Sequence, residues 1–309
     1  MPAPPTPTST NPAINVMQSG ILLLDKPAGL SSNAALQRVR RMLGAEKAGH
    51  VGSLDPLATG MLPICVGEAT KVAGAITAAR KRYQFTIGLG SRTTTGDLEG
   101  DVVETAPTPA LSMAQVELAL VAFRGSQAQV PPMFSALKRE GQPLYRLARA
   151  GVTVERAPRL IEITDLAVLA LKDTQLELTA LCSKGTYIRV LAEDIARRLG
   201  TCGHVVALRR LYVEPFEFEP MHTLNALIAA CEAGSVPVMI APDAALPGIP
   251  SVHLPADLAG RLAHGQAVLM VGGTATGRVR LYGPEGRFMG LGEADASGQV
   301  RPRRLFACM

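Results

Sequence analysis

The sequence predicts an α+β protein with one large domain followed by a small β-rich domain. A chain of 309 residues is long enough to bury a large core and to form a second, smaller unit. Apolar residues recur at helical spacing in several segments, whereas Tyr83, Phe85, Ile87 and Leu89 occupy alternate positions, as in a half-buried strand. Beyond Ser251, short strand-like runs are separated by glycines and turn residues, which is typical of a small barrel.

The first predicted elements are a strand and a capped helix. The strand covers 21–24 and stops before Pro27. Ser31 or Ser32 then caps a helix that Gly44 ends, with an apolar stripe formed by Ala35, Leu36, Val39, Met42 and Leu43. Arginines also lie beside this stripe, and we interpret them as a solvated face: Arg38, Arg40 and Arg41.

Strands and helices follow one another through the middle of the chain. A strand over 82–89 leads through a Thr/Gly/Asp-rich connection, Thr93 to Asp101, to a second strand. Ser112 and Gln115 form a capping-box pattern for a helix that ends at Phe123. The elements expected next are a core strand over 176–182, a helix striped by Ile188, Leu191, Ile195 and Leu199, and a short helix over 224–231.

The C-terminal part differs in composition from the rest. Residues 215–250 contain prolines and many alanines, which is typical of the approach to a domain boundary. A short helix over 256–263 is expected next, followed by four strand-like runs at 267–271, 277–282, 287–291 and 299–306. We therefore expect one domain over 19–248 and another over 251–309.

Composition excludes several classes of protein. The first seventeen residues are rich in Pro, Thr and Ser and lack the basic start and apolar stretch of a signal peptide, so 1–18 is expected to be a disordered tail. No apolar run reaches the ~18 residues of a membrane helix, so no membrane association is expected. The five cysteines show neither CxxC nor zinc-ligand spacing. We expect reduced cysteines, no metal and a cytoplasmic location.

Positive charge is concentrated in one segment, residues 133–159. The net charge of the whole chain is +5, which is a weak signal for nucleic-acid binding. The segment contains only two acidic residues, against six basic ones: Lys138, Arg139, Arg146, Arg149, Arg156 and Arg159. Phe134 and Tyr145 are interleaved with them, as on surfaces that track single-stranded RNA. From these residues alone, an ordinary basic surface helix is the slightly favoured interpretation.

The most informative stretch of the chain surrounds Asp55. This carboxylate lies between Leu54 and Pro56, and glycines at 49, 52 and 60 suit tight turns and close approach of the backbone to a ligand. An acid in so apolar a turn needs a partner or a task. The local pattern leaves two interpretations open: Asp55 caps a helix that opens at Pro56, or it is a functional carboxylate.

The wider sequence decides between them, because it resembles the TruB family of tRNA pseudouridine-55 synthases, in its bacterial stand-alone form. The resemblance extends from Gly20 to the C-terminus. It is carried by the run from Gly49 to Gly60 and by the flanking motifs Gly20 to Ser32, Met61 to Lys71, Lys81-Arg82-Tyr83, Ser183 to Arg189 and His204 to Leu211.

The resemblance implies a fold and a set of RNA contacts. The fold is the pseudouridine synthase fold, a mixed and mainly antiparallel central sheet with flanking helices, and the C-terminal unit resembles a PUA domain, an RNA-binding module. The segment 133–159 corresponds to an insertion that grips the T-arm of tRNA in this family. The implied RNA-binding residues are Lys138, Arg139, Arg146 and Arg149.

The resemblance also implies roles around the scissile bond. Asp55 is the catalytic carboxylate beside ribose C1′, Arg189 is the cation that keeps it charged, and Tyr83 stacks on the target uracil with its hydroxyl placed for the proton step at C5. Tyr187 and Leu208 complete the pocket walls. His50 fills space or stacks where the RNA loop opens, and Lys26 supports the Asp55 loop or contacts a phosphate.

Isomerisation of uridine imports no group and oxidises nothing, so no cofactor is expected. The expected partner is tRNA, with no obligatory protein partner and a monomeric state. Two alternatives remain: a relative that depends on a guide RNA, and an RNA-binding or RNA-folding protein in which catalysis is secondary. An aspartate-nucleophile phosphatase is disfavoured because no second acid stands at DxD spacing from Asp55.

Overall fold

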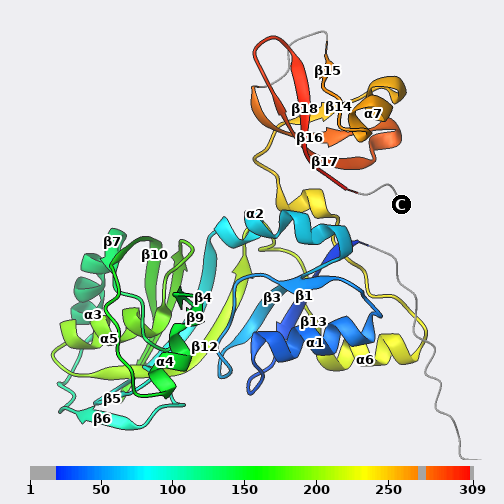
Figure 1. Ribbon diagram of the computed structural model, residues 1–309. Helices are drawn as coiled ribbons and strands as arrows, with labels where there is room; N and C mark the ends of the chain where they lie inside the picture. The colour runs from blue at the N-terminus through cyan, green and yellow to red at the C-terminus, as the bar shows by residue number, and fades with distance from the viewer. Residues whose placement is uncertain (1–18, 271–275, 307–309) are drawn as a thin grey trace, which may run out of the picture.

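The computed structural model describes residues 19–270 and 276–306. The predicted tail, 1–18, lies outside the described residues, as does the end of the strand predicted over 267–271. Two sheets dominate the structure, and Figure 1 shows the smaller one standing apart from the larger. Within the described ranges, no helix combines the length and the apolarity needed to cross a membrane.

The large sheet has nine strands and is mixed but mainly antiparallel, as the family resemblance implied. Along it lie β13 (His222–Thr223), β1 (Gly20–Lys26), β3 (Thr59–Val66), β12 (Gly203–Val213), β4 (Lys81–Leu89), β11 (Gln175–Cys182), β10 (Arg159–Lys172) and β7 (Gly125–Gln129). The short β2 (Ala48–His50) pairs with β3. Only two neighbouring pairs, β1 with β13 and β12 with β3, run parallel.

Near β1, both faces of the large sheet are covered. Alternate side chains of β1 are therefore buried in two different core clusters. Leu22 and Leu24 join a core cluster with the apolar stripes of several helices: α1 (Ser32–Met42), α3 (Met113–Leu120), α5 (Ile188–Arg198) and α6 (Leu224–Glu232). Ile21 and Leu23 pack in a second cluster with Ile76 of α2 (Ala73–Ala78), which follows the 3-10 helix η1 (Gly67–Val72). The predicted strand over 82–89 is confirmed as β4, with buried and half-buried residues in strict alternation.

Helix starts agree with the predicted caps. The Ser31 side chain accepts from the Ala34 amide at 3.1 Å and caps α1. Ser112 and Gln115 form the expected reciprocal box before α3, which continues as the 3-10 helix η2 (Val121–Phe123). The connection from Thr93 to Asp101 joins the small hairpin of β5 (Ser91–Thr93) and β6 (Val102–Thr105), so the second strand is confirmed there.

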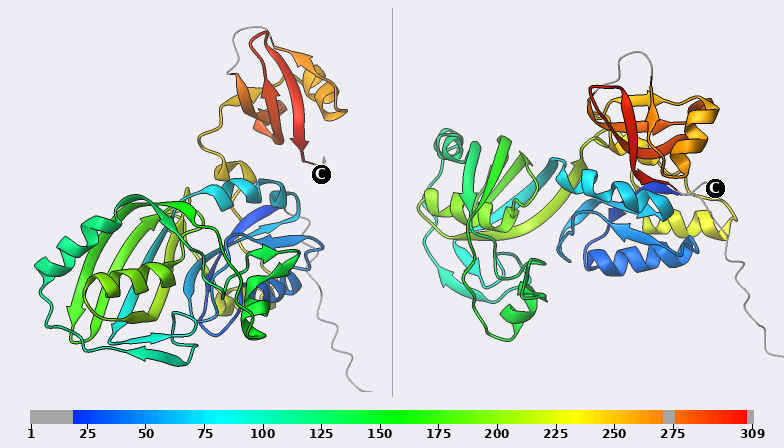
Figure 2. Two further views of the ribbon diagram at one scale, coloured as in Figure 1. Left: turned by 60° about the vertical axis from the view of Figure 1, so that its left-hand side comes forward. Right: turned by 45° about the horizontal axis from the view of Figure 1, so that its top comes forward.

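The C-terminal sheet has five strands and its own core. Its order is β14 (Ser251–His253), β16 (Gly277–Tyr282), β17 (Phe288–Ala294), β18 (Gln299–Leu305) and β15 (Val268–Leu269), with α7 (Ala256–Ala263) and the 3-10 helix η4 (Pro284–Gly286) between strands. Val252, Leu262, Val279 and Val300 are buried in that core. The sequence missed β14, because three residues give too short a pattern to recognise. The two views in Figure 2 show how this unit sits above α2 and η3 (Pro242–Ala245).

Two alternatives that the residues alone left open are excluded. No helix opens at Pro56. The first turn of such a helix would need the Pro56 carbonyl as an acceptor, but this carbonyl accepts from the Gly29 amide at 2.8 Å and from Lys26 Nζ at 3.2 Å. The basic segment 133–159 is also not one surface helix. It forms a hairpin of β8 (Lys138–Arg139) and β9 (Gln142–Pro143), then the six-residue α4 (Leu144–Arg149).

Gly60 shows how tightly β3 is packed beside the Asp55 loop. Its φ is +97°, in the left-handed region, and an added Cβ would lie 2.1 Å from the Arg210 carbonyl oxygen of the parallel strand β12. Neither the backbone conformation nor the space admits a side chain.

We therefore expect Gly60→Ala to lower the free energy of unfolding by roughly 2–5 kcal/mol, from backbone strain and overpacking together. Gly49→Ala is the matched control, because a Cβ at Gly49 meets nothing within 4 Å. It should change stability by no more than about 1 kcal/mol. Urea denaturation of both variants measures this, and equal stabilities would contradict the close approach of β3 and β12.

Candidate functional site

A hollow of about 390 Å³ opens between the Asp55 loop, β4, β12 and the start of α5. It is lined by five of the residues singled out in the sequence: Asp55, Tyr83, Tyr187, Arg189 and Leu208. These residues come from four distant parts of the chain, so the fold assembles them. His50, Lys26 and the basic residues of 133–159 do not line it.

The loop that carries Asp55 is fixed on both sides of the carboxylate. Before it, Ser32 Oγ donates to the Leu54 carbonyl at 2.9 Å and accepts from the Leu54 amide at 2.8 Å. After it, Lys26 Nζ donates to the Pro56 carbonyl, and also to Pro27 and Leu30 at 2.9 and 2.7 Å. The loop is therefore anchored to β1 and α1, and Asp55 itself needs no capping bond to hold its place.

Arg189 is the centre of the hydrogen-bond network. It stands in the first turn of α5, is 4% exposed, and its Nε lies 3.0 Å from Asp55 Oδ2. A second guanidinium nitrogen lies 3.4 Å from Asp55 Oδ1, so both carboxylate oxygens are engaged. The same side chain donates to the backbone carbonyls of Thr95 and Phe134, each at 2.6 Å. The pairing of Asp55 with Arg189 expected from the family resemblance is present in the geometry.

One member of this network, Asp97, was not predicted from the sequence. Its carboxylate is buried and lies 3.6 Å from Arg189 Nε, while Thr95 Oγ1 and the Glu99 amide donate to it at 2.6 and 3.0 Å. Asp97 thus gives Arg189 a second carboxylate partner, which is itself buried. The one available signal was an acid in the polar connection from Thr93 to Asp101, which is common in loops and indicated nothing specific.

Burial and charge act in opposite directions on Asp55. Desolvation raises the pKa of its carboxyl above the ordinary value, and the Arg189 guanidinium pulls that pKa back down. The nearby Asp97 raises the pKa of Asp55, while Lys26 lowers it. The side chain of Asp55 is still 39% exposed, toward the hollow. The Asp55 carboxyl therefore faces an open space in which a ligand could contact it.

Tyr83 forms the wall opposite, on the buried face of β4. It is 8% exposed, and burial raises the pKa of its hydroxyl, so the phenol is neutral. The charge of Arg210, its partner in the register of β12, acts in the opposite direction and lowers that pKa. Arg210 is itself 1% exposed and donates to the carbonyls of Met61 and Gly52 at 2.6 and 2.8 Å. A ring and a hydroxyl are thus held rigidly at the edge of the hollow.

Tyr187 and Leu208 close the remaining sides. Tyr187 precedes α5, and its amide donates to Gln129 Oε1 at 2.8 Å, which ties the start of the helix to β7. Leu208 lies on β12 opposite Phe85 and is 7% exposed. Both present apolar surface to a ligand.

His50 and Lys26 support the site from behind. His50 lies on β2, and burial together with the charge of Arg210 lowers its pKa, so its imidazole is neutral. Its Nδ1 is buried without a hydrogen-bond partner among the described residues. Lys26 is fully buried, and burial lowers the pKa of its ammonium to about 8. Since that ammonium already binds three carbonyls, the geometry suits loop support better than a phosphate contact.

The basic residues of 133–159 lie outside the hollow, and all of them are exposed except Arg156, which is half-buried. Lys138 and Arg139 are on β8, and Arg146 and Arg149 are in the last turn of α4. The guanidinium of Arg149 stands 5.8 Å from the centre of the Tyr145 ring. The segment contacts Arg189 through the Phe134 carbonyl. It also lines the hollow with Ser135, Ala136 and Leu137. In the described ranges, no three His, Cys, Asp or Glu side chains come together as a metal site.

Three family descriptions match the chain. Residues 40–188 match "TruB family pseudouridylate synthase (N terminal domain)", residues 189–239 "tRNA pseudouridylate synthase B C-terminal domain", and residues 250–306 "Pseudouridine synthase II TruB, C-terminal". Together the three matches extend over most of the described chain.

Curated relatives give the same result over nearly the full length. The chain is 50% identical to the tRNA pseudouridine synthase B of Sodalis glossinidius, covering 93% of this chain and 95% of the relative. It is 48% identical to the proteins of the same name from Stutzerimonas stutzeri and Aromatoleum aromaticum, again over 93% of this chain and 95% and 92% of theirs.

Solved structures support the fold. A chain in the structure of an H/ACA RNP bound to a substrate RNA containing 2′-deoxyuridine superposes with a TM-score of 0.70 at 22% identity, over 94% of this chain and 85% of the other. A chain in a Cbf5-Nop10-Gar1 complex gives a TM-score of 0.69 at 23% identity, over 96% and 85%. At such identities the likeness concerns the fold alone. With a family model over residues 40–188 and relatives at 48–50% identity, the chain belongs to the TruB family of pseudouridylate synthases.

Proposed function

We propose that this chain converts the uridine at position 55, in the T-loop of tRNA, to pseudouridine as a stand-alone enzyme. The observation that carries the proposal is the Asp55 carboxylate, held at the open side of the hollow by the buried guanidinium of Arg189. The substrate follows from the tRNA pseudouridine synthase B relatives, which match at 45–50% identity over 93% of this chain.

The proposed reaction breaks the bond from uracil N1 to ribose C1′, rotates the base and joins its C5 to C1′. N1 gains a proton and C5 loses one, so atoms balance without an oxidant or a donated group. Asp55 acts on the sugar as its carboxylate, either by attack at C1′ or as the base of an elimination across the ribose. Both routes need the ionised form, which the Arg189 contacts favour.

The other residues of the hollow hold the freed base. Tyr83 stacks on the uracil, and its neutral hydroxyl serves the proton step at C5. Tyr187 and Leu208 keep the base from leaving while it rotates. His50, which lies behind the hollow, fills space or stacks where the uridine leaves its loop, and stacking there would offset part of the few kcal/mol that flipping a nucleotide requires.

The rest of the chain binds the tRNA in this proposal. Residues 19–248 are the catalytic domain, and 251–309 act as a PUA-like RNA-binding domain built on the five-stranded sheet. Lys138, Arg139, Arg146 and Arg149 grip the T-arm, which their exposure allows. The enzyme works in the cytoplasm as a monomer, without an obligatory protein partner or cofactor.

The first test uses an unmodified tRNA transcript and the purified chain without added metal or cofactor. Carbodiimide labelling and primer extension should reveal a single new signal at the T-loop uridine. Asp55→Asn should lower the rate on the order of 10³-fold or more while tRNA binding persists, because the neutral amide cannot act on C1′. Bound but unmodified tRNA with the wild-type chain would favour instead a guide-dependent enzyme or an RNA-folding protein.

The second test concerns pH. Arg189→Lys keeps a cation but loses the forked contact, so the pKa of Asp55 should rise further above its ordinary value. Because the ionised carboxylate is the active form, the acid limb of the single-turnover rate should move to higher pH. Arg197→Lys, on the exposed side of the same helix, should leave that limb unchanged. Identical pH profiles for all three proteins would exclude Asp55 as the titrating group.

The third test separates the two roles of Tyr83. Tyr83→Phe keeps the stacking ring and removes the hydroxyl, so tRNA affinity should hold while the rate falls by roughly 10²-fold. Tyr212→Phe is the control, because that hydroxyl accepts from Arg82 at 3.2 Å and does not line the hollow. Normal turnover by Tyr83→Phe would leave Tyr83 with the stacking role alone.

A further inference from the structure

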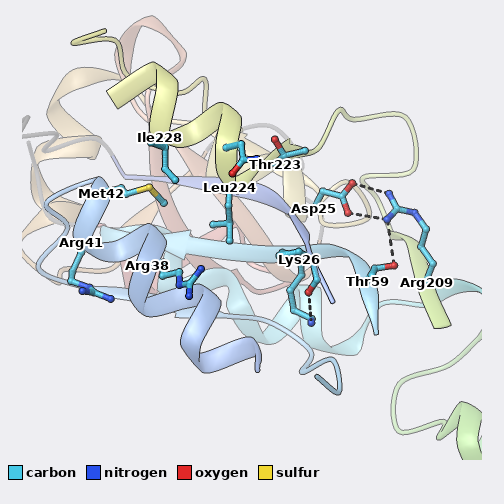
Figure 3. A pocket seen from close by; sticks show the side chains of 12 residues that line it. Asp25, Lys26, Arg38, Arg41, Met42, Thr59, Arg209, Thr223, Leu224 and Ile228 are labelled. Atoms are coloured by element: carbon cyan, nitrogen blue, oxygen red, sulfur yellow. Dashed lines mark hydrogen bonds and ion pairs between the residues drawn. The ribbon is translucent and has the colours of Figure 1, made fainter. Parts of the chain in front are cut away.

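A second and larger hollow, of about 730 Å³, opens between α1 and α6 beside the end of β1 (Figure 3). We refer to it as the α1–α6 pocket. Its lining shares no residue with the hollow at Asp55. Nothing in the proposed isomerisation uses it, although its volume falls within the range of small-molecule and nucleotide sites, about 300–1,000 Å³.

One wall of the α1–α6 pocket is apolar. Met42 comes from α1, and Leu224 and Ile228 stand four residues apart on α6, so both lie on the helix face that Figure 3 shows turned toward α1. Ile228 remains 42% exposed, which is unusual for a residue between two packed helices. The two helices therefore leave an apolar surface uncovered where they diverge.

The other wall carries unpaired positive charge. Arg38 and Arg41 lie one turn apart on α1, and among the described residues neither has a carboxylate partner. Arg40 between them behaves differently, since its guanidinium binds the carbonyls of Ala45 and Glu46 at 3.1 and 2.8 Å. The solvated face expected from the sequence is thus divided: one arginine braces a loop, and two border the pocket.

The remaining charges of the pocket are already satisfied. Asp25 and Arg209 form a two-pronged ion pair, with both nitrogen–oxygen distances at 2.9 Å. The ammonium of Lys26 is saturated by its three carbonyl acceptors. The surplus is therefore the guanidinium of Arg38, which makes no hydrogen bond within the described ranges, together with the terminal nitrogens of Arg41, whose Nε donates to the Gln37 carbonyl at 3.3 Å. Both guanidiniums can bind an anion without breaking an ion pair.

We propose that the α1–α6 pocket binds a nucleotide, with its phosphate on Arg38 and Arg41 and its base against Met42, Leu224 and Ile228. An anion joined to a flat apolar ring matches both walls, whereas inorganic phosphate would leave the apolar wall bare. Asn225, exposed at the rim, adds an amide that can pair with a base edge. The ligand is either a nucleotide of the bound tRNA, which rests on the proposed function, or a free nucleotide, which does not.

The test compares two pocket variants with a control. Arg38→Gln removes one phosphate contact, and Ile228→Trp fills the apolar side without changing charge. Both residues are exposed enough for the fold to tolerate the change. Arg198→Gln removes an exposed charge from α5, outside both hollows. Calorimetry measures binding of adenosine 5′-monophosphate, chosen because the Asp55 hollow is proposed to take uracil, and filter binding measures the affinity for a tRNA transcript over a range of salt.

A free nucleotide is the ligand if adenosine monophosphate binds the wild type and Arg198→Gln alike but both pocket variants at least about tenfold more weakly. A tRNA nucleotide is the ligand if only tRNA binding weakens in both variants. In that case Arg38→Gln alone should also lower the salt slope, by about one.

The proposal is overturned if Ile228→Trp changes the affinity for neither ligand and if Arg38→Gln lowers the affinity for tRNA no more than Arg198→Gln does. Binding of a polyglutamate peptide that depends on Arg38, with no nucleotide effect, would likewise overturn it in favour of an acidic partner. Pocket-dependent binding by a wild-type chain that forms no pseudouridine would sink the proposed function and leave this site standing.

Discussion

The site depends on one buried guanidinium. Arg189 contacts Asp55, the connection that holds Thr95 and Asp97, and the Phe134 carbonyl, and so joins three segments that are far apart in the sequence to α5. Burying such a cation is unfavourable unless its donors are satisfied, and here its donors face two carboxylates and two carbonyls. Desolvation alone would favour a neutral Asp55, so the guanidinium makes a charged carboxylate compatible with this enclosed position.

The central strand β12 serves both hollows because its side chains alternate. Leu208 and Arg210 border the Asp55 hollow, while Arg209 between them pairs with Asp25 at the α1–α6 pocket. Lys26 links the same two places, since it lines the pocket and holds the Pro56 carbonyl of the Asp55 loop. The two hollows therefore share one support, the Lys26 side chain. A ligand that displaced Lys26 from the α1–α6 pocket would also loosen the Asp55 loop.

How well each element could be predicted depended on how regular its pattern is. β4 was predicted because Tyr83 to Leu89 alternate without interruption, and the Asp55 loop because its glycines are conspicuous. β12 was missed because bulges at 205–207 and 210–212 break its alternation and because an arginine, Arg210, fills a buried position. Asp97 could not be found, since its contact with Arg189 exists only after the hairpin of β5 and β6 folds against α5. Such pairings depend on long-range packing, which local periodicity does not encode.

The Phe134 carbonyl gives the basic segment a physical route to the site. Arg189 donates to this carbonyl at 2.6 Å, four residues before Lys138 and the exposed cations that follow. If RNA bound to those cations shifts Phe134, Arg189 loses one acceptor and its remaining donors redistribute between Asp55 and Asp97. The charge on Asp55 responds to that redistribution, because the guanidinium is the largest influence holding its pKa down. RNA binding at those cations and ionisation of the carboxylate would then be coupled through a single side chain.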